Sequence, residues 1–177
     1  MVKEIEKKYL LFKDDTDYTS THFLGLYSSI DELVEDVNAN GKPIKQGYLP
    51  IEVGQVLAGY VGLNVDFEAA EARLRDKGGE LYFTLKGKGG LVRNEAECML
   101  EPEVFGDYWG KTEGNRVEKI RLKIPYQGDP LEIDVYTDRR LIVAEIEVDS
   151  VMRAERINPI GRDITEDKSY KNKNLAK

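Results

Sequence analysis

The alternation of apolar and polar side chains at every second position constrains this chain more than any other feature. In ELYFTLK, apolar residues recur two apart, and VEKIRLKIP, LEIDVY and VAEIEVD repeat the pattern with turn signals such as DRR and Gly-Asp-Pro between them. Successive side chains of a strand point to opposite faces, so a period of two predicts strands with one apolar face. We therefore predict a mainly β fold with peripheral helices (α+β).

Other segments have different patterns. Residues 29–41 have apolar residues at helical spacing, with Ser29 and Glu32 as a capping box and Gly41 as a stop, which predicts an amphipathic helix. QGYLPIEV is interpreted as a second strand, although Pro50 weakens it. Residues 66–79 suit a helix or a strand equally well, and residues 165–177 are interpreted as a polar terminal helix begun by Thr165.

Composition excludes several classes of protein. The 177 residues predict one domain over 1–177, with a helix-bearing insertion at about 12–45 and a second long segment at about 50–68. A net charge of −7 argues against partners such as duplex nucleic acid or an anionic membrane. No apolar segment predicts a signal peptide or a membrane span, and a cytoplasmic location fits.

The chain also has few cysteine and histidine side chains that could act as nucleophiles or bind a metal ion. One cysteine, Cys98, rules out an intrachain disulfide and any CxxC site, and its strand position predicts a small buried hydrophobe. The single histidine, His22, lies in a polar segment and is interpreted as a solvated loop residue. KGKGG lacks the GxxxxGK[ST] pattern and joins two strands, so it is interpreted as a hairpin turn rather than a phosphate loop.

The strand face opposite the apolar one is almost wholly charged, and we call it the charged face. Its acids are Glu4, Glu6, Glu95, Glu97, Glu132, Asp134, Glu145 and Glu147. Its bases are Lys8, Lys86, Arg93, Lys119 and Arg121, joined by Arg73 and Arg75 if these lie on a strand. Like charges two apart, such as those of the first strand, lie about 7 Å from each other and repel unless water, an opposite charge or a metal ion intervenes.

Two architectures accommodate this face. It forms either the solvated outer side of an antiparallel sheet, with charges paired across strands, or the interior of a closed barrel. In the barrel, carboxylates would bind divalent cations and bases would bind phosphate oxygens. The apolar faces would then point outward and need helices to cover them.

A family resemblance favours the barrel. EIEKKYLL resembles the ExExK signature of the CYTH superfamily, the triphosphate tunnel metalloenzymes. It is followed in order by QGYL, ARLR, LYFTLKG, VRNEAE, KIR, EIDVY, AEIEV and the terminal DKSYKN with NLA, which are similar to motifs of that family. The resemblance implies an eight-stranded antiparallel β-barrel tunnel with a charged lumen, and a strand rather than a helix for Arg73 and Arg75.

The resemblance also implies roles for the charged residues. Mg²⁺ or Mn²⁺ would be bound by Glu4, Glu6, Glu145 and Glu147. The triphosphate clamp would comprise Lys8, Arg73, Arg75, Lys86, Arg93, Lys119 and Arg121, with Lys168 reaching back to the tunnel mouth. The remaining acidic pairs, which together with Lys8 form the predicted catalytic group, would bind a second metal or orient the attacking water: Glu95, Glu97, Glu132 and Asp134.

The predicted activity is metal-dependent hydrolysis of inorganic triphosphate. Phosphoryl transfer requires a held and neutralised phosphate chain and an aligned water, but no histidine. The alternatives are an enzyme acting on an organic triphosphate (thiamine triphosphatase, nucleoside triphosphatase or class IV adenylyl cyclase) and a non-catalytic protein that binds triphosphate or polyphosphate. Apolar faces left uncovered by helices would form a homodimer.

Overall fold

The computed structural model describes residues 2–177, and the chain divides into two compact units. The first unit contains the residues up to Glu4 together with Ile44–Val117 and Lys168–Lys177. The second contains Ile5–Pro43 and Glu118–Asp167. Whether residues 1–177 act as a single domain stays a prediction.

Within residues 2–177, eight long strands form a closed antiparallel barrel, as predicted. They are β1 (Val2–Lys13), β3 (Lys42–Leu49), β4 (Glu71–Lys77), β5 (Glu80–Lys86), β6 (Val92–Met99), β7 (Arg116–Tyr126), β8 (Asp129–Tyr136) and β9 (Leu141–Glu147). Their order is β1-β6-β5-β4-β3-β7-β8-β9, and β9 pairs with β1, which closes the sheet. Two short strands, β2 (Thr16–Asp17) and β10 (Arg162–Asp163), pair with β1.

The helices connect or flank the strands. The α-helices are α1 (Ile30–Asn40), α2 (Ile51–Val61), α3 (Pro102–Trp109), α4 (Val151–Glu155) and α5 (Asn172–Leu175). Short 3₁₀ turns occupy η1 (Thr21–Gly25), η2 (Gly110–Thr112) and η3 (Lys168–Tyr170). Among residues 2–177, none of the helices has the length and apolar character needed to cross a lipid bilayer.

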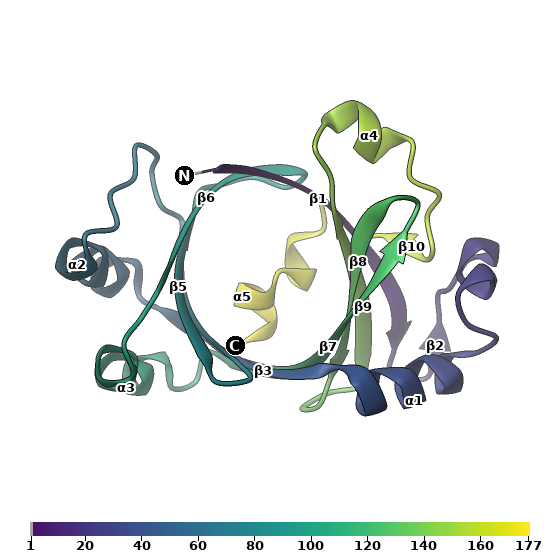
Figure 1. Ribbon diagram of the computed structural model, residues 1–177, viewed down its shortest axis with the longest axis horizontal. Coiled ribbons are helices and arrows are strands. Elements are labelled where there is room, and N and C mark those ends of the chain that lie inside the picture. Colours follow the sequence, from purple (N-terminus) through teal and green to yellow (C-terminus); the bar gives the residue numbers. More distant parts are fainter. Residues whose placement is uncertain (1) are drawn as a thin grey trace. The chain divides into compact units, whose positions relative to one another are not determined.

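In the first unit, helices cover the apolar face of the sheet. Leu57 of α2 and Phe105 of α3 pack with a core that includes Leu74 of β4 and Phe83 of β5. Figure 1 shows α2 and α3 on one side of β5 and α5 on the other. Since the apolar face points toward these helices, the charged face of β4 and β5 is the inner face of the barrel, as the inward-charged architecture predicts.

In the second unit, α1 begins and ends as predicted. The Ser29 hydroxyl accepts a hydrogen bond from the Glu32 amide, and Gly41 caps the other end. Leu33 and Val37 are buried on one face of the helix. The Gly41 backbone approaches the Arg121 carbonyl of β7 so closely that a Cβ would lie 3.0 Å from that oxygen. This contact joins the end of α1 to the sheet.

Two secondary-structure predictions are wrong. Strand β3 ends at Leu49, and Pro50 is the N-cap of α2 rather than part of a strand over residues 46–53. The tail forms only the turn η3 and the short helix α5, not one helix from Thr165. The Thr165 hydroxyl instead donates to Asp163 and accepts from the Lys8 backbone amide, so it joins the tail to β1.

Three smaller predictions have clear outcomes. The ambiguous segment containing ARLR forms strand β4. Cys98 packs against the apolar core of the first unit, but it is half-buried rather than fully buried. His22 is exposed, as predicted, although it belongs to the turn η1.

Candidate functional site

The charged face of the first unit is a network of ion pairs. The Lys86 ammonium lies 2.9 Å from Glu4 and 3.1 Å from Glu95, its direct cross-strand neighbour. Lys86 is 7% exposed, so this charge is almost withdrawn from water. Because a buried charge is tolerated only when it is paired, the two carboxylates account for its burial.

Arg73 occupies the same face on β4 and is 5% exposed. One of its terminal nitrogens donates to the Thr84 hydroxyl at 3.2 Å and lies 3.7 Å from Glu97. Thr84 in turn donates to Glu97 at 2.7 Å. The Arg73 Nε is buried and has no hydrogen-bond partner among the residues that the structure describes. A buried donor of this kind fits an anionic oxygen or a water.

Sequence reasoning missed one carboxylate of the first unit, Glu71. It is 5% exposed and lies 3.5 Å from Arg93, whose Nε donates to the Gly87 carbonyl. Burial raises the pKa of Glu71, but the charges of Arg93, Lys86 and Arg73 outweigh it and hold that pKa below its usual value. Glu71 is two residues before Arg73, so the strand alternation could have identified it.

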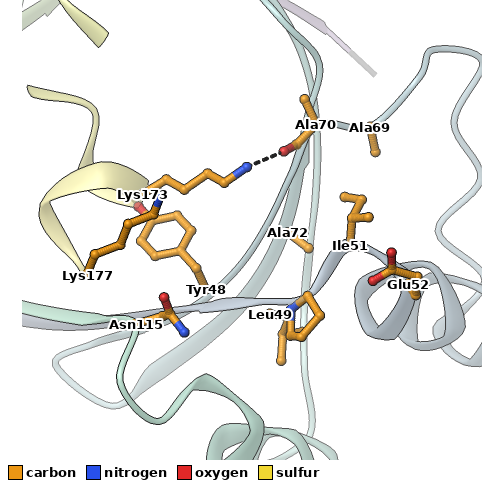
Figure 2. Close-up of a pocket in the computed structure, with 11 residues that line it drawn as sticks. Tyr48, Leu49, Ile51, Glu52, Ala69, Ala70, Ala72, Asn115, Lys173 and Lys177 are labelled. Carbon is orange, nitrogen blue, oxygen red and sulfur yellow. Dashed lines mark hydrogen bonds between the residues drawn. The ribbon is translucent and has the colours of Figure 1, made fainter. Parts of the chain in front are cut away.

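The first unit also contains a pocket of about 420 Å³, lined by residues of β3, α2, β4 and the tail. Figure 2 shows Tyr48 of β3, Asn115, and the tail residues Lys173 and Lys177 on one side of it, with Glu52 of α2 on the other. The Lys173 ammonium donates to the Ala70 carbonyl at 2.8 Å.

Three tail lysines, Lys168, Lys171 and Lys173, lie in or between η3 and α5. Lys168 is exposed in η3, and its carbonyl accepts a hydrogen bond from the Asn174 side chain. Lys171 donates to the Gly89 carbonyl at 2.7 Å. The Lys173 ammonium thus binds a carbonyl just before β4, and the Lys171 ammonium binds one after β5. The sequence motifs did not indicate these contacts.

In the second unit, Arg121 is the centre of the charged face. It binds both oxygens of Asp134, at 2.6 and 2.8 Å, and lies 3.1 Å from Glu132 and 3.6 Å from Glu145. Lys119 lies 2.7 Å from Asp134, and both side chains are 0% exposed. Burial raises the pKa of Asp134, but Arg121 and Lys119 lower it more strongly, to about 2. Asp134 is therefore ionised at neutral pH.

Lys8 and the carboxylates of β9 and β1 complete this face. Lys8 lies 3.4 Å from Glu145, its cross-strand neighbour. Glu6 stands directly opposite Glu147 in the same ladder. Directly opposite residues have Cβ atoms about 4.5–5.5 Å apart, and like charges there are destabilising. A cation between the two carboxylates would remove this repulsion.

The donor set fits a hard divalent cation. Within residues 2–177, no group of three or more His, Cys, Asp or Glu side chains is arranged to hold a metal ion. Mg²⁺, however, is usually bound through one or two carboxylates and completes its shell with waters and substrate phosphates. The pair formed by Glu6 and Glu147, which lie directly opposite each other, meets that requirement.

Sequence comparison finds curated relatives. The chain is 36% identical to an inorganic triphosphatase from Nitrosomonas europaea over 148 residues, which cover 80% of this chain and 88% of the relative. It is 32% identical to an inorganic triphosphatase from Acetivibrio thermocellus over 126 residues, covering 67% and 78% of the two chains. No protein-family model matches the sequence.

Solved structures have the same fold. A crystal structure of an inorganic triphosphatase aligns over 99% of this chain and 95% of its own, with 30% identity and a TM-score of 0.56. A candidate adenylate cyclase from Bacillus halodurans aligns over 88% of this chain and 86% of its own, with 18% identity and a TM-score of 0.52. The second likeness supports the fold alone.

Proposed function

Because this chain belongs to the family of the inorganic triphosphatases, in the CYTH superfamily of triphosphate tunnel metalloenzymes, we propose that it hydrolyses inorganic triphosphate to pyrophosphate and phosphate. One observation carries the proposal. Five bases of the predicted clamp are buried on the charged face: Lys8, Arg73, Lys86, Lys119 and Arg121. Arginine and lysine side chains gathered on one strand face are the donors that bind the oxygens of a polyanion such as triphosphate.

The bases would act by binding and neutralising the phosphate chain. Arginine suits this task because its planar fork can bind two phosphate oxygens at once, whereas lysine supplies a compact charge. These groups would stabilise the charge that develops on the leaving phosphate oxygen, which is where most catalysis of phosphoryl transfer arises. We infer that Arg75, Arg93 and the five buried bases share this role as the clamp, with the exposed Lys168 left as a prediction.

The acidic pairs would divide between two roles. Glu97 is partly exposed and accepts a hydrogen bond from Thr84, so it is the carboxylate that we propose to orient the attacking water, with Glu95 beside it. Asp134 is enclosed by Arg121 and Lys119, so with Glu132 it would hold these bases in place rather than meet the water.

Mg²⁺ or Mn²⁺ would be held by Glu6 and Glu147, with Glu4 and Glu145 as further ligands. A bound divalent ion would neutralise phosphate charge and polarise a phosphoryl oxygen. A cytoplasmic location and a homodimer stay predictions.

The proposal is tested by measuring phosphate release from inorganic triphosphate, ATP and thiamine triphosphate with Mg²⁺, with Mn²⁺ and with chelator. We expect metal-dependent release from inorganic triphosphate. Glu6→Gln and Glu147→Gln should abolish it without unfolding the protein. Glu118→Gln, which alters an exposed carboxylate of β7, is the control and should leave release unchanged. Near-normal activity of Glu6→Gln would contradict the metal role, and preference for an organic triphosphate would contradict the substrate.

A further inference from the structure

Gln46 is one of the uncharged side chains on the charged face of the first unit, together with Thr84 and Tyr48. It is 0% exposed and lies on β3 directly opposite Arg75 of β4. The Arg75 Nε donates to the Gln46 side-chain oxygen at 3.1 Å, and the Gln46 amide nitrogen donates to the Tyr48 hydroxyl at 2.7 Å. Gln46 therefore links an arginine of the proposed clamp to a buried tyrosine.

The donor and acceptor types of Arg75 and Tyr48 determine the orientation of the Gln46 side-chain amide. Arginine only donates hydrogen bonds, so the Gln46 oxygen must face Arg75 and the amide nitrogen must face Tyr48. Burial, followed by the Glu71 carboxylate, raises the pKa of Tyr48 well above its usual range, so its hydroxyl stays neutral and can accept. The amide is consequently fixed in one orientation.

Gln46, like Thr84 beside Arg73, binds a clamp base without adding a charge. Arg121 and Lys86 are held by carboxylates, which also cancel part of their positive charge. The amide of Gln46 binds the Arg75 guanidinium without contributing a negative charge. An arginine recognises a phosphate through a plane of fixed orientation, so holding Nε sets the direction of the fork.

Tyr48 in turn is held in place. Its side chain is 5% exposed and lines the pocket beside Lys173 and Lys177. Figure 2 shows its ring below the Lys173 side chain, with the residues of α2 on the far side of the pocket. The tyrosine is therefore a buried anchor for the amide of Gln46.

We propose that Gln46, anchored by Tyr48, is a positioning residue that orients Arg75 toward the phosphate chain through a hydrogen bond that adds no negative charge. This inference rests on the proposed function, because it assumes that Arg75 binds triphosphate. The inference assigns a role to Gln46 and Tyr48, two uncharged residues among ionised ones. That role is to fix the direction of the Arg75 guanidinium, not to balance its charge.

The test is a double-mutant cycle read by calorimetric binding of sodium tripolyphosphate. Gln46→Leu removes both hydrogen bonds, and losing a hydrogen bond to a charged group predicts about tenfold weaker binding or more. If Gln46 acts through Arg75, the same change in an Arg75→Ala background should weaken binding less than about twofold. Equal losses in both backgrounds would overturn the inference.

Two further variants keep the test independent of folding. Gln46→Glu retains an acceptor for Arg75 but adds a negative charge, so it should also weaken tripolyphosphate binding. Unchanged binding would overturn the inference that the partner of Arg75 must be uncharged. Tyr48→Phe removes only the hydroxyl and should give a smaller loss that disappears in the Gln46→Leu background. Lys45→Ala, an exposed change on the opposite face of β3, is the control.

The outcomes also separate this inference from the proposed function. Wild-type protein that neither binds nor hydrolyses tripolyphosphate would overturn both. Wild-type binding with losses that are additive across the cycle would overturn the positioning role of Gln46 and leave the triphosphatase proposal standing.

Discussion

We expect Asp134→Asn to lower the free energy of unfolding substantially at pH 7, by about 2–5 kcal/mol. The change keeps the shape of the side chain and one acceptor, but it removes a charge from a group that is 0% exposed. That charge is bound by two nitrogens of Arg121 and by Lys119. The upper value applies if the loss of the carboxylate leaves both buried cations undercompensated.

The lower value follows from the pKa of Asp134. Burial alone would raise this pKa, but Arg121 and Lys119 lower it from 3.8 to about 2. A shift of nearly two units corresponds to about 2 kcal/mol of stability. Because the folded-state pKa is depressed, this stability is present above the unfolded-state pKa and is lost as the pH falls toward the folded-state value. The difference between wild type and variant should therefore be constant above about pH 5 and shrink below about pH 4.

Urea unfolding followed by circular dichroism at several pH values measures both effects. Asp129→Asn is a matched control on the same strand, since Asp129 pairs with Arg153 at 2.9 Å on a partly exposed surface. Such a pair contributes about 0–1 kcal/mol. A loss below about 1 kcal/mol for Asp134→Asn at pH 7 would refute the reasoning, as would a loss that does not change down to pH 3.

Two further predictions concern packing and orientation. Gly54→Ala in α2 should destabilise the protein by about 1–3 kcal/mol, because the new Cβ would lie 2.3 Å from the Cβ of Ala72. Gly59→Ala in the same helix is the control: its Cβ meets nothing within 4 Å, and the change should stabilise the protein by up to about 1 kcal/mol. Thermal unfolding of the two variants distinguishes these outcomes. Thr84→Val should lower kcat/KM for triphosphate, because it removes the hydroxyl that accepts a hydrogen bond from Arg73. Thr84→Ser keeps a hydroxyl and should keep kcat/KM near the wild-type value. Equal losses of kcat/KM in the two variants, measured by steady-state kinetics, would contradict a role for this hydroxyl in orienting Arg73.

The strands were predictable from the sequence because their two faces differ so sharply. In β5, apolar residues pack under the helices and Lys86 points to the charged face, so a period of two is unmistakable. In β4, alanine and leucine alternate with arginines over too few residues to exclude a helix, and the resemblance was needed to decide. Alternation alone located Lys119 and Arg121 on the charged face, but it could not specify their partners, which depend on cross-strand register.

Helix α2 was missed because its packing uses small residues. Gly54 and Ala58 are buried, and the close approach of Gly54 to Ala72 requires the absence of a side chain. These small residues weaken the helical periodicity on which a prediction depends, and Pro50 suggested an interrupted strand instead of a helix start. The tail was misjudged for a different reason, since Thr165 binds Asp163 locally and joins β1 through the Lys8 amide.

The charge balance differs between the two units, and this bears on where a metal would bind. Adding Glu71 to the predicted set, the first unit has four bases (Arg73, Arg75, Lys86 and Arg93) and four acids (Glu4, Glu71, Glu95 and Glu97). The second has three bases (Lys8, Lys119 and Arg121) and five acids (Glu6, Glu132, Asp134, Glu145 and Glu147). The excess of two carboxylates in the second unit equals the charge of one divalent ion. Since Glu6 and Glu147 face each other there, the second unit is where Mg²⁺ or Mn²⁺ would relieve most repulsion.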